Sequence, residues 1–139
     1  MVEKALLLTG SSILLILGTL HMKYTFFSSK FQPRNIQAEN EMKNTSPKLT
    51  RETTMWNAWI GFNASHSLGA IYFGIINIVL VINFFSVVQE SLVLSLFNIA
   101  ILLFYLFLAK RFWFKIPLMG ILVSTICFMA AHVLIFLSR

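Results

Sequence analysis

The chain has 139 residues, with eleven Lys and Arg against five acidic residues, a formal net charge of +6, and 58% hydrophobic but only 12% charged residues. Soluble domains contain about 45–50% apolar and about 25% charged residues, so this composition excludes an ordinary soluble domain and indicates a membrane protein. The single cysteine, Cys127, excludes an intrachain disulfide and a cysteine-based metal cage. Because the basic residues flank apolar runs, we expect anionic membrane lipids as partners and no nucleic acid.

Four apolar runs, near residues 5–27, 55–83, 91–109 and 116–137, each have the roughly 20 residues that a membrane span requires. No small-x-small cleavage site follows Leu20, so we expect the first run to be a retained helix and not a signal peptide. Within the polar loop 28–54, Pro33 is expected to start a short helix that reaches Asn44. The other two connections are short, which makes neighbouring spans antiparallel. The prediction is an all-α single domain over residues 1–139, an up-down bundle of four transmembrane helices.

The distribution of basic residues predicts the orientation. With four spans, the polar loop 28–54 and the connection 110–115 lie on the same side of the membrane. That side carries nine of the eleven basic residues: Lys23, Lys30, Arg34, Lys43, Lys48, Arg51, Lys110, Arg111 and Lys115. The positive-inside rule therefore puts both loops in the cytoplasm and both termini outside.

Each span has one face of polar and small residues, because positions three, four and seven apart share a helical face. The aligned residues are Gly10, Leu14, Gly18, His21 and Thr25 in the first span; Trp56, Trp59, Asn63, His66, Ser67, Ala70, Gly74 and Asn77 in the second; Ser91, Ser95, Asn98, Leu102, Tyr105 and Ala109 in the third; and Thr125, Phe128, Met129 and His132 in the fourth. We expect these faces to point at one another. Packing explains most of them, since small residues let membrane helices approach closely and Ser, Thr and Asn hydrogen-bond between helices.

The histidines are the candidate functional residues, because ionisable groups inside a span usually face an interior site. From the helical rise, His21 lies roughly 9 Å and His66 roughly 15 Å below the cytoplasmic boundary. The candidate ligand-binding residues in this half are His21, Asn63, His66, Ser67 and Tyr105. A second polar cluster of Asn77, Asn98 and His132 is expected nearer the outer side. A neutral histidine that is satisfied by Ser or Asn, with no ligand, is the alternative.

Several kinds of chemistry are disfavoured. No carboxylate lies inside any of the four runs, which argues against a proton relay and against a Glu-rich di-iron site. The chain has neither a phosphate-binding loop nor an HExxH pair, and the neighbours His66 and Ser67 cannot face each other as a nucleophile and its base. No catalytic residue or metal ligand is therefore singled out. Three functions stay open: binding of a lipid-like or other apolar ligand, a redox protein with haem or a metal held by two histidines, and a structural protein whose polar faces pack the bundle or a homodimer.

Two segments carry a resemblance: Leu20-His21 near the end of the first span, and Met55-Trp56-Asn57-Ala58-Trp59-Ile60-Gly61-Phe62-Asn63-Ala64-Ser65-His66-Ser67-Leu68-Gly69 in the second. Here the chain resembles a group of small uncharacterised bacterial four-span integral membrane proteins, and it is similar to the DoxX-like proteins in architecture alone. The likeness covers the first two spans well and the last two only as apolar helices. It implies the four-span fold and a location in a bacterial inner membrane, and it implies no chemistry.

Overall fold

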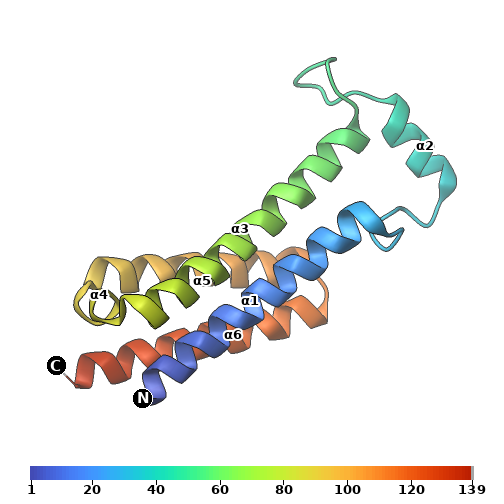
Figure 1. The fold of residues 1–139 in the computed structure, drawn as a ribbon. Coiled ribbons are helices and arrows are strands. Elements are labelled where there is room, and N and C mark those ends of the chain that lie inside the picture. Colours follow the sequence, from blue (N-terminus) through green and yellow to red (C-terminus); the bar gives the residue numbers. More distant parts are fainter. Residues whose placement is uncertain (139) are drawn as a thin grey trace. The chain divides into compact units, whose positions relative to one another are not determined.

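The computed structural model describes residues 1–138, and every regular element in that range is an α-helix (Figure 1). The helices are α1 (Val2–Phe27), α2 (Ile36–Asn44), α3 (Met55–Asn83), α4 (Phe85–Glu90), α5 (Leu92–Phe112) and α6 (Lys115–Leu137). Four of them, α1, α3, α5 and α6, are long and apolar enough to cross a membrane. The predicted all-α fold class is confirmed, and the chain is an integral membrane protein with four spans.

One local prediction about the connections differs from the structure. The expectation that Pro33 starts the loop helix is wrong, because α2 begins at Ile36 and Asn35 is its N-cap, with the Asn35 side chain accepting a hydrogen bond from the backbone N–H of Gln37 at 2.9 Å. Asparagine suits this position because its side-chain oxygen satisfies an amide that the first turn leaves free. In addition, the connection after α3 contains the short helix α4, whose Val88 is buried.

Helix α5 continues beyond the predicted end of the third span. Lys110 and Arg111 lie in its last turn and Trp113 is its C-cap. Cations near a helix C-terminus interact favourably with the unpaired carbonyls there, which explains why the basic residues belong to the helix and not to a loop. Only Trp113 and Phe114 then separate α5 from α6.

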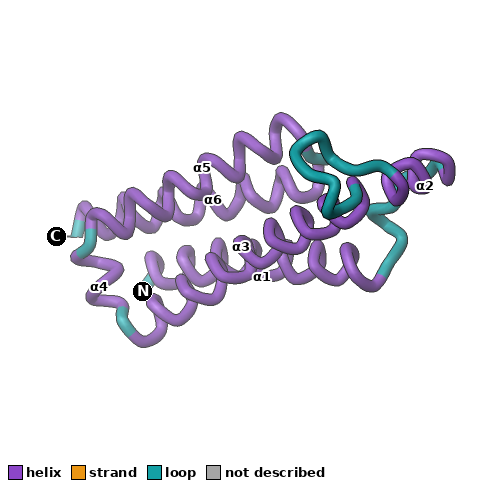
Figure 2. The backbone as a smooth tube through the Cα atoms, turned by 90° about the horizontal axis from the view of Figure 1, so that it is seen from above, coloured by secondary structure: helices purple, strands orange, loops and turns teal. Residues whose placement is uncertain are grey.

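Backbone packing divides the chain into two compact units, residues 1–17 with 70–138 and residues 18–69, which are described separately. In the first unit, contacts join α1 with α3, α1 with α6, α3 with α5, and α5 with α6. Helices α5 and α6 run side by side (Figure 2), and the Ser124 hydroxyl of α6 donates to the Gly10 carbonyl of α1 at 2.9 Å. Gly74 brings α3 so near to α1 that an added Cβ would lie 2.8 Å from the Ser11 carbonyl oxygen. Small residues permit this approach, as is typical of membrane helices.

The inward faces mostly follow the helical period. In α5 the buried residues are Ser95, Asn98, Leu102 and Ala109. In α6 the expected position of Met129 is wrong, because its side chain is 47% exposed whereas that of the preceding Phe128 is fully buried. Successive residues on a helix are rotated by about 100°, so only one of these two adjacent side chains can point into the interior. Phe128 takes the inward position, packed 5.4 Å from the ring of Phe73.

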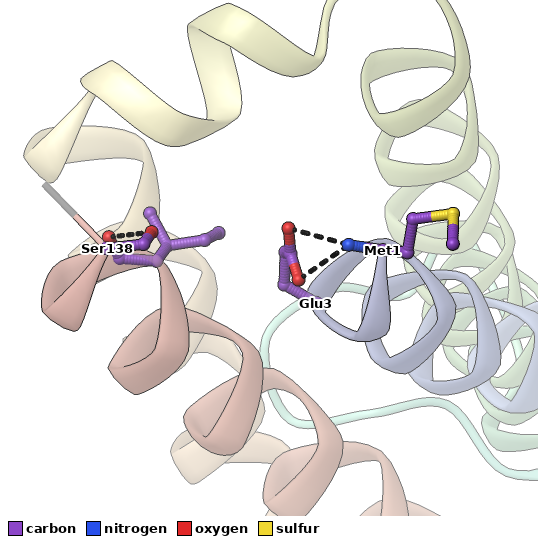
Figure 3. A network of polar contacts seen from close by, with 4 residues as sticks. Met1, Glu3 and Ser138 are labelled. Carbon is purple, nitrogen blue, oxygen red and sulfur yellow. Dashed lines mark hydrogen bonds and ion pairs between the residues drawn. The ribbon is translucent and has the colours of Figure 1, made fainter.

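Both ends of the described chain belong to the first unit. The amino group of Met1 pairs with the Glu3 carboxylate at 3.0 and 3.1 Å, in an exposed position (Figure 3). The Ser138 hydroxyl donates to the Ile135 carbonyl at 3.0 Å, which closes the last turn of α6. Exposed ion pairs contribute little to stability, so these contacts satisfy polar groups at the helix ends and do not form a binding site.

Candidate ligand site

A histidine and an asparagine from two different spans meet in the second unit. The Nε2 atom of His21, on α1, lies 2.8 Å from the Oδ1 atom of Asn63, on α3. The two residues are 42 positions apart in the sequence, so helix packing and not local geometry brings them together. Both side chains are partly buried. Polar contacts of this kind between two spans either hold the helices together or border a ligand site.

The Asn63 amide is also held from within its own helix. Its Nδ2 atom donates to the Trp59 carbonyl oxygen, one turn earlier, at 2.8 Å. The Ser67 hydroxyl, one turn later, donates to the backbone carbonyl oxygen of Asn63 at 2.7 Å. Ser67 is fully buried, and its only proton is used in that bond, so a ligand can use Ser67 only as an acceptor.

The second histidine lies next to the first. The ring of His66 is centred 5.4 Å from the ring of His21, with an angle of 71° between the two planes. Asn63 and His66 are three residues apart on α3 and therefore share a face. His21, Asn63 and His66 thus form one cluster, hereafter the histidine cluster.

Aromatic side chains border the histidine cluster. Phe31, in the loop between α1 and α2, lies with its ring centre 4.4 Å from that of His21 and 6.4 Å from that of Trp59. Trp59 in turn stacks on Trp56 at 5.9 Å, and the Lys43 ammonium group of α2 lies 4.9 Å from the Trp56 ring centre. These contacts tie the loop segment to the ends of the two spans within the second unit. Phe31 was missed by sequence reasoning, and a lone aromatic residue in a polar loop was the signal that could have found it.

The remaining predicted residues belong to the first unit. The ring of Tyr105 on α5 is centred 6.3 Å from that of Trp113. Asn77 and Asn98 join α3 to α5 by two amide hydrogen bonds: Asn98 Nδ2 donates to Asn77 Oδ1 at 2.8 Å, and Asn77 Nδ2 donates to Asn98 Oδ1 at 3.4 Å. His132 lies with its ring 6.2 Å from that of Phe128.

A groove of about 290 Å³ runs along α5 and α6 in the first unit. Its polar side chains are Ser95 and His132, and the rest of its lining is apolar: Leu92, Leu96, Ile99, Met129, Val133, Ile135, Phe136 and Leu137. Both His132 and Ser95 are more than nine-tenths buried. An apolar groove on membrane-spanning helices fits hydrocarbon, and its lining provides little to recognise a particular head group.

The geometry of the histidine cluster does not match ligation of haem or a metal by the Nε2 atoms of both histidines. Ligation by two histidines requires a ring nitrogen of each to point at the metal, but Nε2 of His21 points at Asn63 at 2.8 Å. Among residues 1–138 no group of three or more His, Cys, Asp or Glu side chains is placed to hold a metal ion. The cluster as folded therefore does not fit a haem held by both histidines through Nε2.

Comparison with known proteins finds no family model, no curated protein and no solved structure that matches this chain. The chemistry of the histidine cluster therefore rests on the residues that form it.

Proposed function

We propose that this integral membrane protein binds an amphiphilic ligand, with the polar head of the ligand at the histidine cluster and its apolar part along the spans. The proposal rests on one observation: the 2.8 Å hydrogen bond between His21 and Asn63 has the ring of a second histidine, His66, 5.4 Å away. Ionisable groups inside a span are rare and usually serve an interior site. The neighbouring rings of Phe31 and Trp59 match the usual composition of ligand sites, which combine aromatic walls with a few polar groups.

A purely structural role accounts for part of the cluster. A single His–Asn bond between α1 and α3 would serve to hold two spans together. Under the proposal, the His66 imidazole serves the ligand; under the structural explanation, it only helps to hold the spans together. The two explanations differ in what His66 does, so His66 is the residue to change.

We expect His66→Ala to leave the protein folded and to reduce the amount of bound amphiphile. The change removes an imidazole that the proposal assigns to the ligand, while the His21–Asn63 bond stays in place. The measurement is native mass spectrometry of protein purified in mild detergent, which counts the small molecules that remain bound. A drop in stability with unchanged ligand content would support the structural role and refute the proposal.

Ser65→Ala is the matched control. Ser65 is adjacent to His66 but exposed, and its hydroxyl donates to the Phe62 carbonyl of its own helix at 3.1 Å. It projects about 100° away from His66, so its loss should change neither stability nor ligand content. Equal effects at positions 65 and 66 would show that the assigned face is wrong.

The proposal includes the location and orientation of the protein. The resemblance of residues 55–69 to small bacterial four-span proteins supports a bacterial inner membrane. The nine basic residues in or beside the loops 28–54 and 110–115 support a cytoplasmic position for these loops, with both termini outside. Under this orientation the histidine cluster lies in the cytoplasmic half of the membrane.

Cysteine labelling tests the orientation. Asn40, on α2, and Ser86, on α4, are both exposed, whereas the native Cys127 is buried and provides the background. In intact cells, a membrane-impermeant maleimide should label Ser86→Cys and spare Asn40→Cys until the cells are opened. Labelling of Asn40→Cys in intact cells, with Ser86→Cys protected, would show that the topology is the reverse of the proposed one.

A further inference from the structure

The Asn63 side chain has one possible orientation in this cluster. The Trp59 carbonyl oxygen can only accept a hydrogen bond, so the Asn63 atom that faces it at 2.8 Å must be the NH₂ group. The other end of the amide, the oxygen Oδ1, is then the atom that faces His21. An amide oxygen can only accept, and His21 must therefore donate to it.

This orientation determines which nitrogen carries the proton when His21 is neutral. Nε2 of His21 lies 2.8 Å from Asn63 Oδ1 and must be the N–H nitrogen. A neutral imidazole has one N–H and one bare nitrogen, so Nδ1 is left with a lone pair. Among residues 1–138, the bond to Asn63 is the one hydrogen bond that the structure gives the His21 ring, and Nδ1 is not enclosed. Phe31 covers a ring face at 4.4 Å in a tilted arrangement, so it contributes no polar group to Nδ1.

A bare imidazole nitrogen selects the chemistry of its partner. It accepts a hydrogen bond from a hydroxyl group, while a carboxylate or phosphate oxygen, which has no proton to offer, would face it lone pair to lone pair. An anion needs a hydrogen-bond donor, and the one N–H of a neutral His21 is already bonded to Asn63. An ether or ester oxygen has no proton to donate, so it cannot form a hydrogen bond with the bare nitrogen.

We propose that the ligand of the histidine cluster is a neutral amphiphile with a hydroxyl head, whose O–H donates to Nδ1 of His21. Asn63 is a positioning residue: it holds His21 as the Nε2–H form and so sets the preference for a hydrogen-bond donor. This inference rests on the proposed function, because it names the head group for that same site. The preference should be about tenfold in affinity, the size of one neutral hydrogen bond.

The tautomer is tested without any ligand. In protein labelled with ¹⁵N-histidine, nitrogen–proton NMR correlations should show His21 protonated at Nε2 and bare at Nδ1 in the wild type. Asn63→Leu removes the acceptor and should let the proton distribute between both nitrogens. Asn83→Leu is the control, since Asn83 lies on the same helix and makes the same bond to its own backbone, to Val79 at 3.1 Å, from an exposed position. A wild-type His21 protonated at Nδ1 would overturn the inference while leaving the proposed function standing.

The head group is tested with three probes of equal chain length: dodecanol, dodecyl methyl ether and dodecanoic acid. We expect the wild type and Asn83→Leu to bind dodecanol about tenfold more tightly than the ether, and Asn63→Leu to lose this discrimination. Equal binding of alcohol and ether, or tighter binding of the acid with His21 protonated at both nitrogens, would overturn the hydroxyl assignment alone. Binding of all three that ignores His66→Ala, or no binding of any, would refute the proposed function and this inference with it.

Discussion

Gly74→Ala is expected to destabilise the protein by about 1–3 kcal/mol, the usual effect of inserting a methyl group into a well-packed core. The added Cβ would lie 2.8 Å from the Ser11 carbonyl oxygen, 2.8 Å from the Leu15 Cβ and 2.9 Å from the Leu15 amide nitrogen. Two of these atoms belong to the backbone of α1 and cannot move alone. Relief therefore requires α1 and α3 to separate within the first unit, which loosens the contacts around them. Titration from mild detergent into SDS, followed by tryptophan fluorescence, measures the loss.

Two other glycines provide comparison variants for this prediction. Gly61 lies on the same helix, and an added Cβ there meets nothing within 4 Å, so Gly61→Ala should be neutral or should stabilise by up to about 1 kcal/mol through helix propensity. At Gly120 the nearest atom is the Leu17 Cδ1, 2.7 Å away, which is the flexible end of a side chain and can move. Gly120→Ala should therefore fall between the two. Equal losses at Gly61 and Gly74 would contradict the close approach of α1 and α3.

Asn98→Leu is expected to have the second largest effect. Asn98 is 4% exposed and Asn77 is 3% exposed, and each amide donates to the other across α3 and α5. Hydrogen bonds between membrane helices average about 0.6 kcal/mol and reach about 1.7 kcal/mol. Removing one partner also leaves the Asn77 oxygen without its donor, which adds to the loss. The expected result is a destabilisation of about 1–2 kcal/mol in the same SDS titration.

A double-mutant cycle separates the pair from its surroundings. Asn77→Leu with Asn98→Leu removes both polar groups, so no amide is left buried without a partner. The double variant should then be less destabilised than the sum of the two single variants. Losses that simply add would mean that the two amides do not stabilise each other, and that α3 and α5 are held by other contacts.

The spans could be predicted from hydropathy alone, because a backbone in hydrocarbon must satisfy its hydrogen bonds internally and an apolar run of sufficient length has no alternative to a helix. The start of α2 was predicted at Pro33 and lies at Ile36, because the Asn35 cap outweighs the preference of proline for a first turn. Helix α4 was not predicted, since Phe85–Glu90 is too short for a periodic signal and Phe84 before it has no capping side chain.

The histidine cluster was partly accessible from the sequence. The helical rise and period predict that His21, Asn63 and His66 lie at similar depths and on inward faces, which is why they were candidates. Phe31 was not a candidate, because a loop sequence does not indicate which residues of the spans the loop will contact. The orientation of the Asn63 amide could not be predicted either, since the sequence is equally compatible with an NH₂ group that faces His21.

The sequence by itself determined the all-α class, the four spans, the polar stripe on each span and the excess of basic residues in and beside the loops 28–54 and 110–115. These properties follow from chain length, hydropathy and a helical period of 3.6 residues, all of which are local. The tertiary structure alone decided that Gly74 meets Ser11, that Phe128 and not Met129 faces inward, and that Asn63 presents its oxygen to His21. A stripe is a wide sector of a helix, whereas a hydrogen bond or a methyl clash depends on a few tenths of an ångström between two helices, and only their packing sets that distance.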